Sequence, residues 1–198
     1  MRLVILDRDG VINRDSDEYI KSPDEWVPIP GSLEAIARLC RADYKVVVVT
    51  NQSGVARGLF SVDTLNSIHV HMLERVRQKG GQLDAIFFCP HGPDDECLCR
   101  KPKPGMFLDL AERLKVNLAA VPAVGDSLRD LQAARAVNAL PVLVRTGKGD
   151  LALDCLRDSD LANTAVYEDL STFVDSLLNG ELGERVNMLL QRTESRNA

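Results

Sequence analysis

The sequence predicts a doubly wound α/β domain with a mostly parallel sheet, and three observations support this fold class. Short runs rich in β-branched residues alternate along the chain with longer segments. In the longer segments apolar residues recur every three or four positions, which is typical of crossover helices. The chain has 198 residues, of which 45% are hydrophobic and 27% charged, as in a globular protein with a single core. We expect one domain over residues 1–180 and a C-terminal tail over 181–198.

Six apolar runs are predicted to be buried strands, because each is short and ends at polar or turn residues. In chain order they are Leu3–Leu6, Lys45–Thr50, Ala85–Cys89, Ala120–Val124, Pro141–Val144 and Thr164–Tyr167. Four segments between them have helical spacing: Ser32–Arg41, Val62–Lys79, Pro104–Leu114 and Leu128–Val137. Acidic residues near two helix starts and a Gly-Gly pair after one helix end strengthen this prediction. The polar segment Asp15–Pro30, which contains three prolines, is predicted to be an ordered excursion over the top of the sheet.

Charge and hydropathy exclude several classes of protein. Lys and Arg number 24 against 29 Asp and Glu, and this net charge of −5 argues against broad nucleic-acid binding but allows a local cationic pocket. No apolar run approaches the roughly 18 residues that a membrane span needs. The first apolar run stops at Asp7 and is too short for a secretory signal, so we expect a cytoplasmic protein.

Acidic side chains follow the first and fourth predicted strands. Asp7 and Asp9 come directly after the first strand, and Asp126 follows the fourth. A single Asp at such a position usually caps a helix or a turn. In a doubly wound sheet, however, the carboxyl ends of the strands meet at one cleft, where three carboxylates repel one another unless a divalent cation lies between them. The sequence therefore predicts a magnesium site at this edge of the sheet.

Groups that can bind phosphate occur in two further segments of the sequence. Thr50 and Asn51 end the second strand, and Arg100, Lys101 and Lys103 form a short cationic run. Together with a metal and a carboxylate nucleophile, these groups suffice for phosphoryl transfer through an aspartyl phosphate. Spacing alone leaves open whether the ammonium of Lys101 or that of Lys103 pairs with the phosphate.

Four short motifs resemble those of the haloacid dehalogenase superfamily of phosphohydrolases. They occur in order at predicted strand ends: Asp7-Arg8-Asp9-Gly10, Thr50, Lys101-Pro102-Lys103-Pro104 and Gly125-Asp126. The resemblance covers residues from about 3 to 146. It implies a Rossmann-like haloacid dehalogenase fold, without a large cap domain, and it points to Lys101 as the phosphate-pairing ammonium.

The resemblance also implies a role for each motif residue. Asp7 is expected to be the nucleophile and a magnesium ligand, and Asp9 the general acid and base. Asp9 is expected to offer its backbone carbonyl to the magnesium and Asp126 its carboxylate, while Thr50 and Lys101 complete the catalytic set. Arg8 is expected to face elsewhere and Lys103 to be a rim charge. Asp130 is expected either to support the water shell of the metal or to cap the following helix.

Three of the five cysteines and one histidine cluster within eleven residues. Cys89 and His91 form one pair and Cys97 and Cys99 another, each with one residue between its members. Three thiolates and one imidazole close a tetrahedral zinc site with no open position, so the predicted zinc is structural. This predicted zinc loop spans residues 89–99. Its segment between the two pairs has no apolar content, and the metal would replace the core that the segment lacks.

The zinc-loop spacing, followed directly by Arg-Lys-Pro, narrows the resemblance to two groups of phosphatases. These are the heptose bisphosphate phosphatases of the lipopolysaccharide precursor pathway and the histidinol-phosphate phosphatases. The strings from Thr50 to Gly58 and from Arg100 to Met106 favour the first group, which implies loss of the C7 phosphate of a heptose 1,7-bisphosphate. Histidinol-phosphate phosphatase is the alternative, and a non-enzymatic zinc-bearing module that binds a phosphorylated ligand is a more remote one.

The favoured group implies a small phosphorylated sugar as the partner, and the expected absence of a cap makes a monomer the natural state. The residues expected around the sugar and its phosphates are Asp15, Tyr19, Thr50, Asn51, Gln52, Ser53, Arg57, Arg100 and Lys101.

Overall fold

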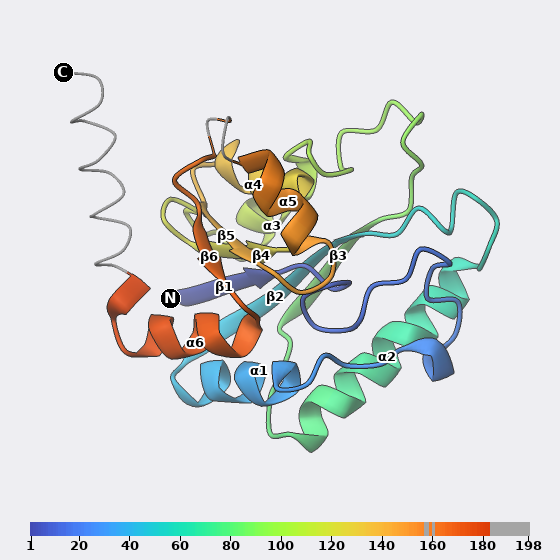
Figure 1. The fold of residues 1–198 in the computed structure, drawn as a ribbon. Coiled ribbons are helices and arrows are strands. Elements are labelled where there is room, and N and C mark those ends of the chain that lie inside the picture. The colour runs from blue at the N-terminus through green and yellow to red at the C-terminus, as the bar shows by residue number, and fades with distance from the viewer. Residues whose placement is uncertain (157–158, 160, 183–198) are drawn as a thin grey trace.

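A computed structural model describes residues 1–156, 159 and 161–182 of the chain. Its centre is a six-stranded parallel sheet in the order β3-β2-β1-β4-β5-β6 (Figure 1). The strands are β1 (Arg2–Leu6), β2 (Tyr44–Asn51), β3 (Ala85–Cys89), β4 (Pro122–Gly125), β5 (Leu140–Val144) and β6 (Ala165–Tyr167). All six predicted strands are therefore confirmed, with ends that differ by at most two residues. The first strand lies in the middle, so its carboxyl end is flanked by those of β2 and β4.

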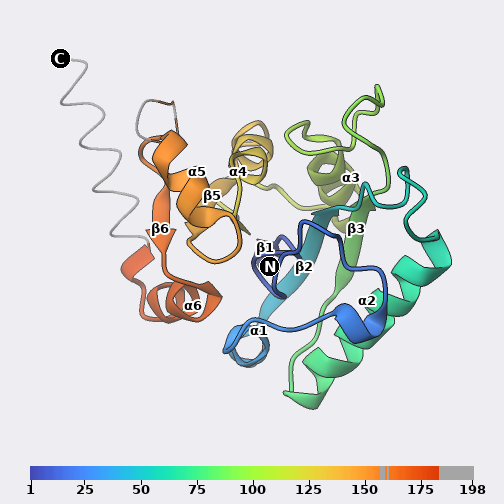
Figure 2. The same cartoon turned by 45° about the vertical axis from the view of Figure 1, so that its right-hand side comes forward.

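Helices cover both faces of the sheet, which confirms the doubly wound class (Figures 1 and 2). Along β1, Val4 and Leu6 pack on one face and Leu3 and Ile5 on the other, following the period of two of a strand. The first face is covered by α1 (Ser32–Arg41), α2 (Val62–Gln78) and α6 (Leu170–Leu178). The second face is covered by α3 (Gly105–Leu114), α4 (Leu128–Arg135) and α5 (Gly149–Leu156).

Four of these helices lie where the sequence predicts them, whereas α5 and α6 were not predicted. Helix α6 begins at Asp169, whose side chain accepts a hydrogen bond from Thr172 N at 2.8 Å. Phe173 and Val174 of this helix are fully buried against the sheet. Helix α5 connects β5 to β6, whereas α6 follows β6, the last strand of the sheet.

The excursion between β1 and α1 is ordered, as predicted. Ile20 and Trp26 are buried beneath it, and a short 3₁₀ turn, η1 (Pro23–Glu25), precedes the tryptophan. The Trp26 ring meets the edge of His71 in α2 at 5.8 Å between ring centroids. Backbone pairing of Asn13 with Pro28 closes the base of the excursion. The segment is thereby fixed over the carboxyl ends of the strands.

The described residues contain no separate cap domain, and none of their helices is long and apolar enough to cross a membrane. The tail expected over 181–198 lies outside the described residues from residue 183 onward, and the domain boundary at residue 180 stays a prediction.

Candidate active site

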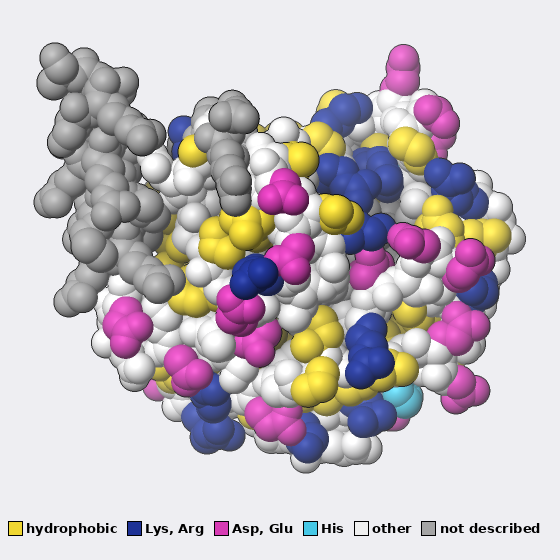
Figure 3. Space-filling model, viewed as in Figure 1, with side chains coloured by type: hydrophobic (Ala, Val, Ile, Leu, Met, Phe, Trp, Pro, Cys, Tyr) yellow, Lys and Arg dark blue, Asp and Glu magenta, His cyan; other side chains and the backbone are white. Residues whose placement is uncertain are grey.

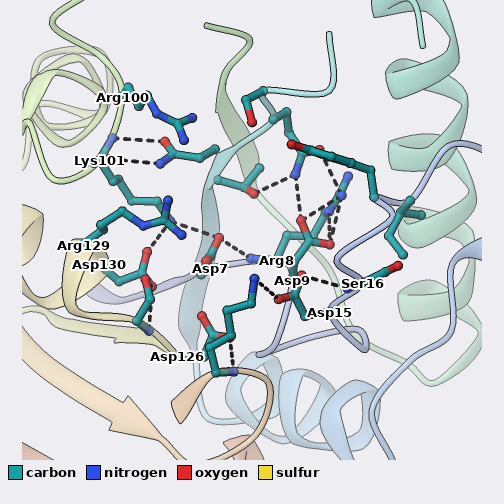
Figure 4. A pocket seen from close by; sticks show the side chains of 18 of the residues that line it. Asp7, Arg8, Asp9, Asp15, Ser16, Arg100, Lys101, Asp126, Arg129 and Asp130 are labelled. Atoms are coloured by element: carbon teal, nitrogen blue, oxygen red, sulfur yellow. Dashed lines mark hydrogen bonds and ion pairs between the residues drawn. The ribbon is translucent and has the colours of Figure 1, made fainter. Parts of the chain in front are cut away.

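A polar cavity of about 380 Å³ lies at the carboxyl ends of β1, β2 and β4 (Figure 4). Its walls come from the ends of these strands, the 15–20 segment, the residues after the zinc loop, the start of α4 and the loop after β5. Lys and Arg side chains gather beside Asp and Glu side chains on the upper right of the face in Figure 3. The residues expected from the sequence to surround the substrate all line this cavity: Asp15, Tyr19, Thr50, Asn51, Gln52, Ser53, Arg57, Arg100 and Lys101.

The turn after β1 places Asp7 beside Asp126. Gly10 in this turn has a φ of +78°, a conformation that favours glycine. A Cβ atom at position 10 would lie 2.0 Å from Asp126 Oδ2, so any larger residue would push this carboxylate away. The glycine of the Asp-x-Asp-Gly motif is thus required for the close approach of the two strand ends.

Lys101 lies at the bottom of the cavity between two carboxylates. Its Nζ atom is 3.0 Å from Asp7 Oδ1, 2.6 Å from Asp130 Oδ1 and 2.7 Å from the carbonyl oxygen of Val49. Burial by itself would lower the pKa of Lys101, but the charges of Asp130 and Asp7 raise it above its usual value. Lys101 therefore offers the cavity a permanent positive charge.

Lys103 points away from this centre. It donates from Nζ to the carbonyl oxygen of Cys97 at 2.7 Å and is exposed. The geometry thus distinguishes the two lysines that the spacing left open.

Asp7, Asp126 and Asp130 offer oxygen atoms within 4.8 Å of one another, a set that can hold a metal ion. Burial, followed by repulsion from neighbouring carboxylates, raises the pKa of Asp7 to about 7 and that of Asp126 to about 8. A divalent cation would relieve this repulsion and favour the ionised carboxylates. The donor set therefore fits Mg²⁺, a hard cation that prefers oxygen ligands.

Hydrogen bonding separates the roles of the three carboxylates. Asp7 uses Oδ1 to accept from Arg8 N at 2.7 Å, and Asp126 uses Oδ2 to accept from Lys148 N at 2.8 Å, so the other oxygen of each stays available to a cation. Both oxygens of Asp130 are engaged, Oδ1 by Lys101 and Oδ2 by Ser127 N and Oγ. Asp130 caps helix α4, which agrees with one of the two roles expected for it.

The expectation that Arg8 faces elsewhere than the site is wrong. Its side chain is 1% exposed and lines the cavity, where it pairs with Asp9 at 2.9 Å. Burial would raise the pKa of Asp9, but the charge of Arg8 and the hydrogen bonds from Asn13 and Gln52 hold it below its usual value. The reason is local: β1 ends at Leu6, so the alternation of a strand no longer governs residue 8.

Asn51 is largely engaged by the backbone of Lys101. Its side-chain amide donates to the Lys101 carbonyl oxygen at 3.0 Å and accepts from Lys101 N at 3.0 Å. This pair of bonds ties the end of β2 to the residue that carries the buried ammonium. Asn51 therefore positions Lys101 in addition to lining the cavity.

Sequence reasoning missed two cationic residues of the cavity, Arg129 and Lys148. Lys148 follows β5, and its Nζ atom is 3.2 Å from Asp15 and 3.1 Å from Asp17. These contacts join the loop after β5 to the 15–20 segment across the mouth of the cavity. The signal was present, since residues that follow the end of a parallel strand are the ones that face the site.

The four predicted zinc ligands converge at the edge of the cavity, all with donor atoms within 4.8 Å of one another. Cys89 Sγ is 3.5 Å from His91 Nδ1, 3.8 Å from Cys97 Sγ and 3.3 Å from Cys99 Sγ. Zn–S bonds of about 2.3 Å in a tetrahedron imply separations of roughly 3.8 Å between sulfur atoms. The donor set and its spacing therefore fit a closed zinc site. The backbone of this cluster also contacts a cavity residue, because the His91 carbonyl oxygen accepts a hydrogen bond from Arg100 Nη1 at 3.1 Å.

Comparison with known proteins adds a family and named relatives. A family model described as haloacid dehalogenase-like hydrolase matches residues 1–138. The chain is 58% identical over 178 residues to the D-glycero-beta-D-manno-heptose-1,7-bisphosphate 7-phosphatase of Bordetella bronchiseptica, covering 90% of this chain and 98% of that protein. It is 52% identical over 176 residues to the protein of the same name from Pseudomonas aeruginosa, covering 89% of this chain and 97% of that protein.

Two crystal structures have a similar fold. The D,D-heptose 1,7-bisphosphate phosphatase from B. bronchiseptica, complexed with magnesium and phosphate, matches with a TM-score of 0.87 and 58% identity, over 91% of this chain and 99% of that one. The D,D-heptose 1,7-bisphosphate phosphatase from Burkholderia thailandensis matches with a TM-score of 0.71 and 47% identity, over 90% of this chain and 99% of that one.

Proposed function

The chain belongs to the haloacid dehalogenase-like hydrolase family, and we propose that it removes the C7 phosphate of D-glycero-β-D-manno-heptose 1,7-bisphosphate. The observation that carries the proposal is the convergence of Asp7, Asp9, Lys101 and Asp126 on one cavity. High identity to the named phosphatases over nearly their whole length supports the substrate. The product would enter the synthesis of a nucleotide-activated heptose for lipopolysaccharide.

In this mechanism Asp7 attacks the phosphorus of the C7 phosphate in line and forms an aspartyl phosphate. Arg8 favours the ionised form of Asp9, so the minor protonated fraction of the Asp9 carboxyl protonates the departing C7 oxygen. The Asp9 carboxylate then takes a proton from the water that hydrolyses the aspartyl phosphate. Thr50 and Lys101 bind the phosphoryl oxygens, and the Lys101 ammonium balances the charge that collects on them. Asp7, Asp126 and the backbone carbonyl of Asp9 would hold Mg²⁺, which would neutralise and orient the phosphate.

The rim of the cavity supports a bisphosphate over histidinol phosphate. Arg57, Arg100 and Arg129 line the cavity outside the catalytic centre, where they can bind a second phosphate by charge-assisted hydrogen bonds. Histidinol phosphate carries an ammonium and an imidazole in place of a second anion. With this ligand bound, the arginines would have no second phosphate to pair with, and they would repel its positive charge.

The zinc site has a structural role in this proposal. It fixes the loop that ends at Arg100 and Lys101, and it needs reduced cysteines, which supports a cytoplasmic site of action. We further propose that the enzyme acts as a monomer, because all the groups of the mechanism come from one chain.

The proposal is tested by measuring kcat/KM for both anomers of the heptose bisphosphate and for histidinol phosphate. We expect the β anomer of the bisphosphate to exceed histidinol phosphate by at least ~10²-fold, because each lost charged contact costs about 1.5–3 kcal/mol. Arg100→Ala should reduce this ratio. Equal rates, or a preference for histidinol phosphate, would refute the heptose assignment. Absence of magnesium-dependent hydrolysis of any phosphate ester would instead favour a non-enzymatic binding module.

A further inference from the structure

The carboxylate of Asp9 accepts hydrogen bonds from the side chains of three other residues, of which Arg8 is seen beside it in Figure 4. Its Oδ1 atom accepts from Arg8 Nε at 3.1 Å and from Asn13 Nδ2 at 2.8 Å. Its Oδ2 atom accepts from Arg8 Nη2 at 2.9 Å and from Gln52 Nε2 at 2.9 Å. Both carboxylate oxygens are therefore held, and the two-point contact with Arg8 fixes the plane of the carboxylate.

Gln52 connects this carboxylate to the phosphate-binding hydroxyl of Thr50. Its Oε1 atom accepts from Arg8 Nη2 at 3.0 Å, and because a guanidinium can only donate, the amide orientation is determined. The Nε2 atom then donates to Asp9 and also to Thr50 Oγ1, at 3.0 Å. Since Thr50 accepts from Gln52, its own hydroxyl hydrogen is free to be donated to a phosphoryl oxygen.

His69 holds the other end of the guanidinium. Its Nε2 atom is 3.4 Å from Arg8 Nη1, and since Arg8 can only donate, His69 is the acceptor and its ring is neutral. The ring is buried and meets Phe88 of β3 edge-on, with 5.8 Å between ring centroids. Arg8 is thus fixed from α2 as well as from Gln52, the residue that follows β2.

From this network we infer that Arg8 is the positioning residue for Asp9, and that Gln52 makes the acid–base carboxyl and the phosphate-binding hydroxyl one rigid unit. The inference rests on the proposed function only in assigning proton transfer to Asp9. Arg8 itself touches neither the phosphate nor the leaving group in this scheme. It acts by keeping the carboxyl where it can reach the leaving oxygen, and a displacement of about 1 Å can cost 10²-fold in rate.

A positioning role of this kind is visible in how the rate depends on the leaving group. Phenyl phosphate has a poor leaving group that needs the proton from Asp9, whereas p-nitrophenyl phosphate has a good one that needs it far less. The experiment compares kcat/KM for these two substrates in wild type, Arg8→Lys, Asp9→Asn and the double variant. Lysine keeps the charge of Arg8 but lacks the planar two-point contact.

We expect Arg8→Lys to lower the rate on phenyl phosphate by about 10-fold or more beyond its effect on p-nitrophenyl phosphate. The ratio of kcat/KM for phenyl phosphate to that for p-nitrophenyl phosphate should fall further in Asp9→Asn. Arg8→Lys should have no additional effect on this ratio when Asp9 is already replaced. A parallel loss on both substrates in Arg8→Lys would show a merely structural role and overturn the inference. An unchanged ratio in Asp9→Asn would overturn it as well.

A second pair of variants tests the same inference if Arg8→Lys does not fold. His69→Phe keeps an aromatic ring against Phe88 but removes the acceptor for Arg8, so the substrate ratio should fall by about threefold. His71→Phe is the matched control on the same helix, where the ring contacts Trp26 and not Arg8, and it should leave the ratio unchanged. Equal ratios in the two variants would contradict the inference.

This comparison uses only aryl phosphates, so it does not depend on the heptose. If wild type hydrolyses them but not the heptose bisphosphate, the proposed substrate fails while the role of Arg8 is still decided.

Discussion

Asp7 is the residue on which the proposed chemistry depends most directly. Asparagine at this position is nearly isosteric and can still accept the hydrogen bond from Arg8 N, but it cannot form an acyl phosphate. We expect Asp7→Asn to lower turnover of p-nitrophenyl phosphate by at least about 10⁴-fold. Circular dichroism and phosphate-induced thermal stabilisation should stay close to wild type. Turnover within tenfold of wild type would remove Asp7 from the role of nucleophile.

His69 gives the protein a dependence of stability on pH. Burial, together with the charge of Arg8, lowers its pKa from 6.5 to about 4. Between these two pH values the unfolded chain binds a proton that the folded protein does not, so the stability that His69 contributes is complete above pH 6.5 and declines as pH falls towards 4. The expected slope is about 1.4 kcal/mol per pH unit.

The measurement is urea denaturation of wild type and His69→Gln at several pH values between 4 and 7. The variant lacks the titrating ring, so its free energy of unfolding should fall less steeply with decreasing pH. The difference in slope should correspond to about one bound proton. His71→Gln serves as the control and should keep the wild-type slope. Identical slopes in wild type and His69→Gln would mean that His69 titrates normally in the folded protein.

At the level of single residues, the sequence predicted side chains that follow regular strands and missed those set by tertiary contacts. Asp7, Thr50 and Asp126 lie where strand ends place them. Arg8 was expected to point away, but its direction is decided by Asp9, Gln52 and His69, which are distant from one another in the chain or lie beyond the strand. Such a network has no periodic signature.

The predicted zinc loop is the element that would link metal binding to the part of the cavity that contains Arg100 and Lys101. We expect about one zinc per chain by elemental analysis and its loss in Cys97→Ser. Activity should fall by about 10–100-fold, because Arg100 is held by the carbonyl oxygen of His91 and Lys103 by that of Cys97. Cys155→Ser is the control, since this cysteine is exposed and remote from the cluster. Full activity in zinc-free protein would make the cluster incidental.

The loop after β5 is expected to control access of the substrate through Lys148. Replacing Lys148 with Met removes its ion pairs with Asp15 and Asp17 and releases the 15–20 segment. We expect a KM for the heptose bisphosphate raised by about 10-fold, with folding stability changed by less than about 1 kcal/mol. Arg145→Met is the control, because Arg145 pairs with Asp150 and Glu168 and does not line the cavity. A large loss of stability would show that Lys148 supports the fold instead.

At the level of elements, the six strands were predictable because buried parallel strands are short, continuous apolar runs. Helix α6 had a usable signal in Leu170, Phe173 and Val174 after an Asp cap, but it was not recognised. Helix α5 was also missed; it has eight residues, as many as the predicted helix α4, so its length does not explain the omission.

Magnesium removal is a prediction for the whole molecule. Three hydrophobic clusters hold the layers together without help from the carboxylates at the sheet edge. Gel filtration into magnesium-free buffer should therefore abolish activity while far-ultraviolet circular dichroism stays unchanged, and added Mg²⁺ should restore turnover. Zinc content is followed throughout, since a strong chelator would remove both metals. Unfolding in the absence of magnesium would contradict this account.

The strand order has a consequence for synthesis on the ribosome. Strand β1 is made first, yet its neighbour β4 is made only after α1, β2, α2, β3 and α3 have been synthesised. Until then one edge of β1 has no partner, and Asp7 has no Asp126 beside it. A nascent chain stalled before residue 122 therefore carries three of the four motifs but lacks Gly125-Asp126 and cannot assemble the cavity. Hydrolytic activity appears only once both halves of the sheet have met, which makes turnover a reporter of completed folding.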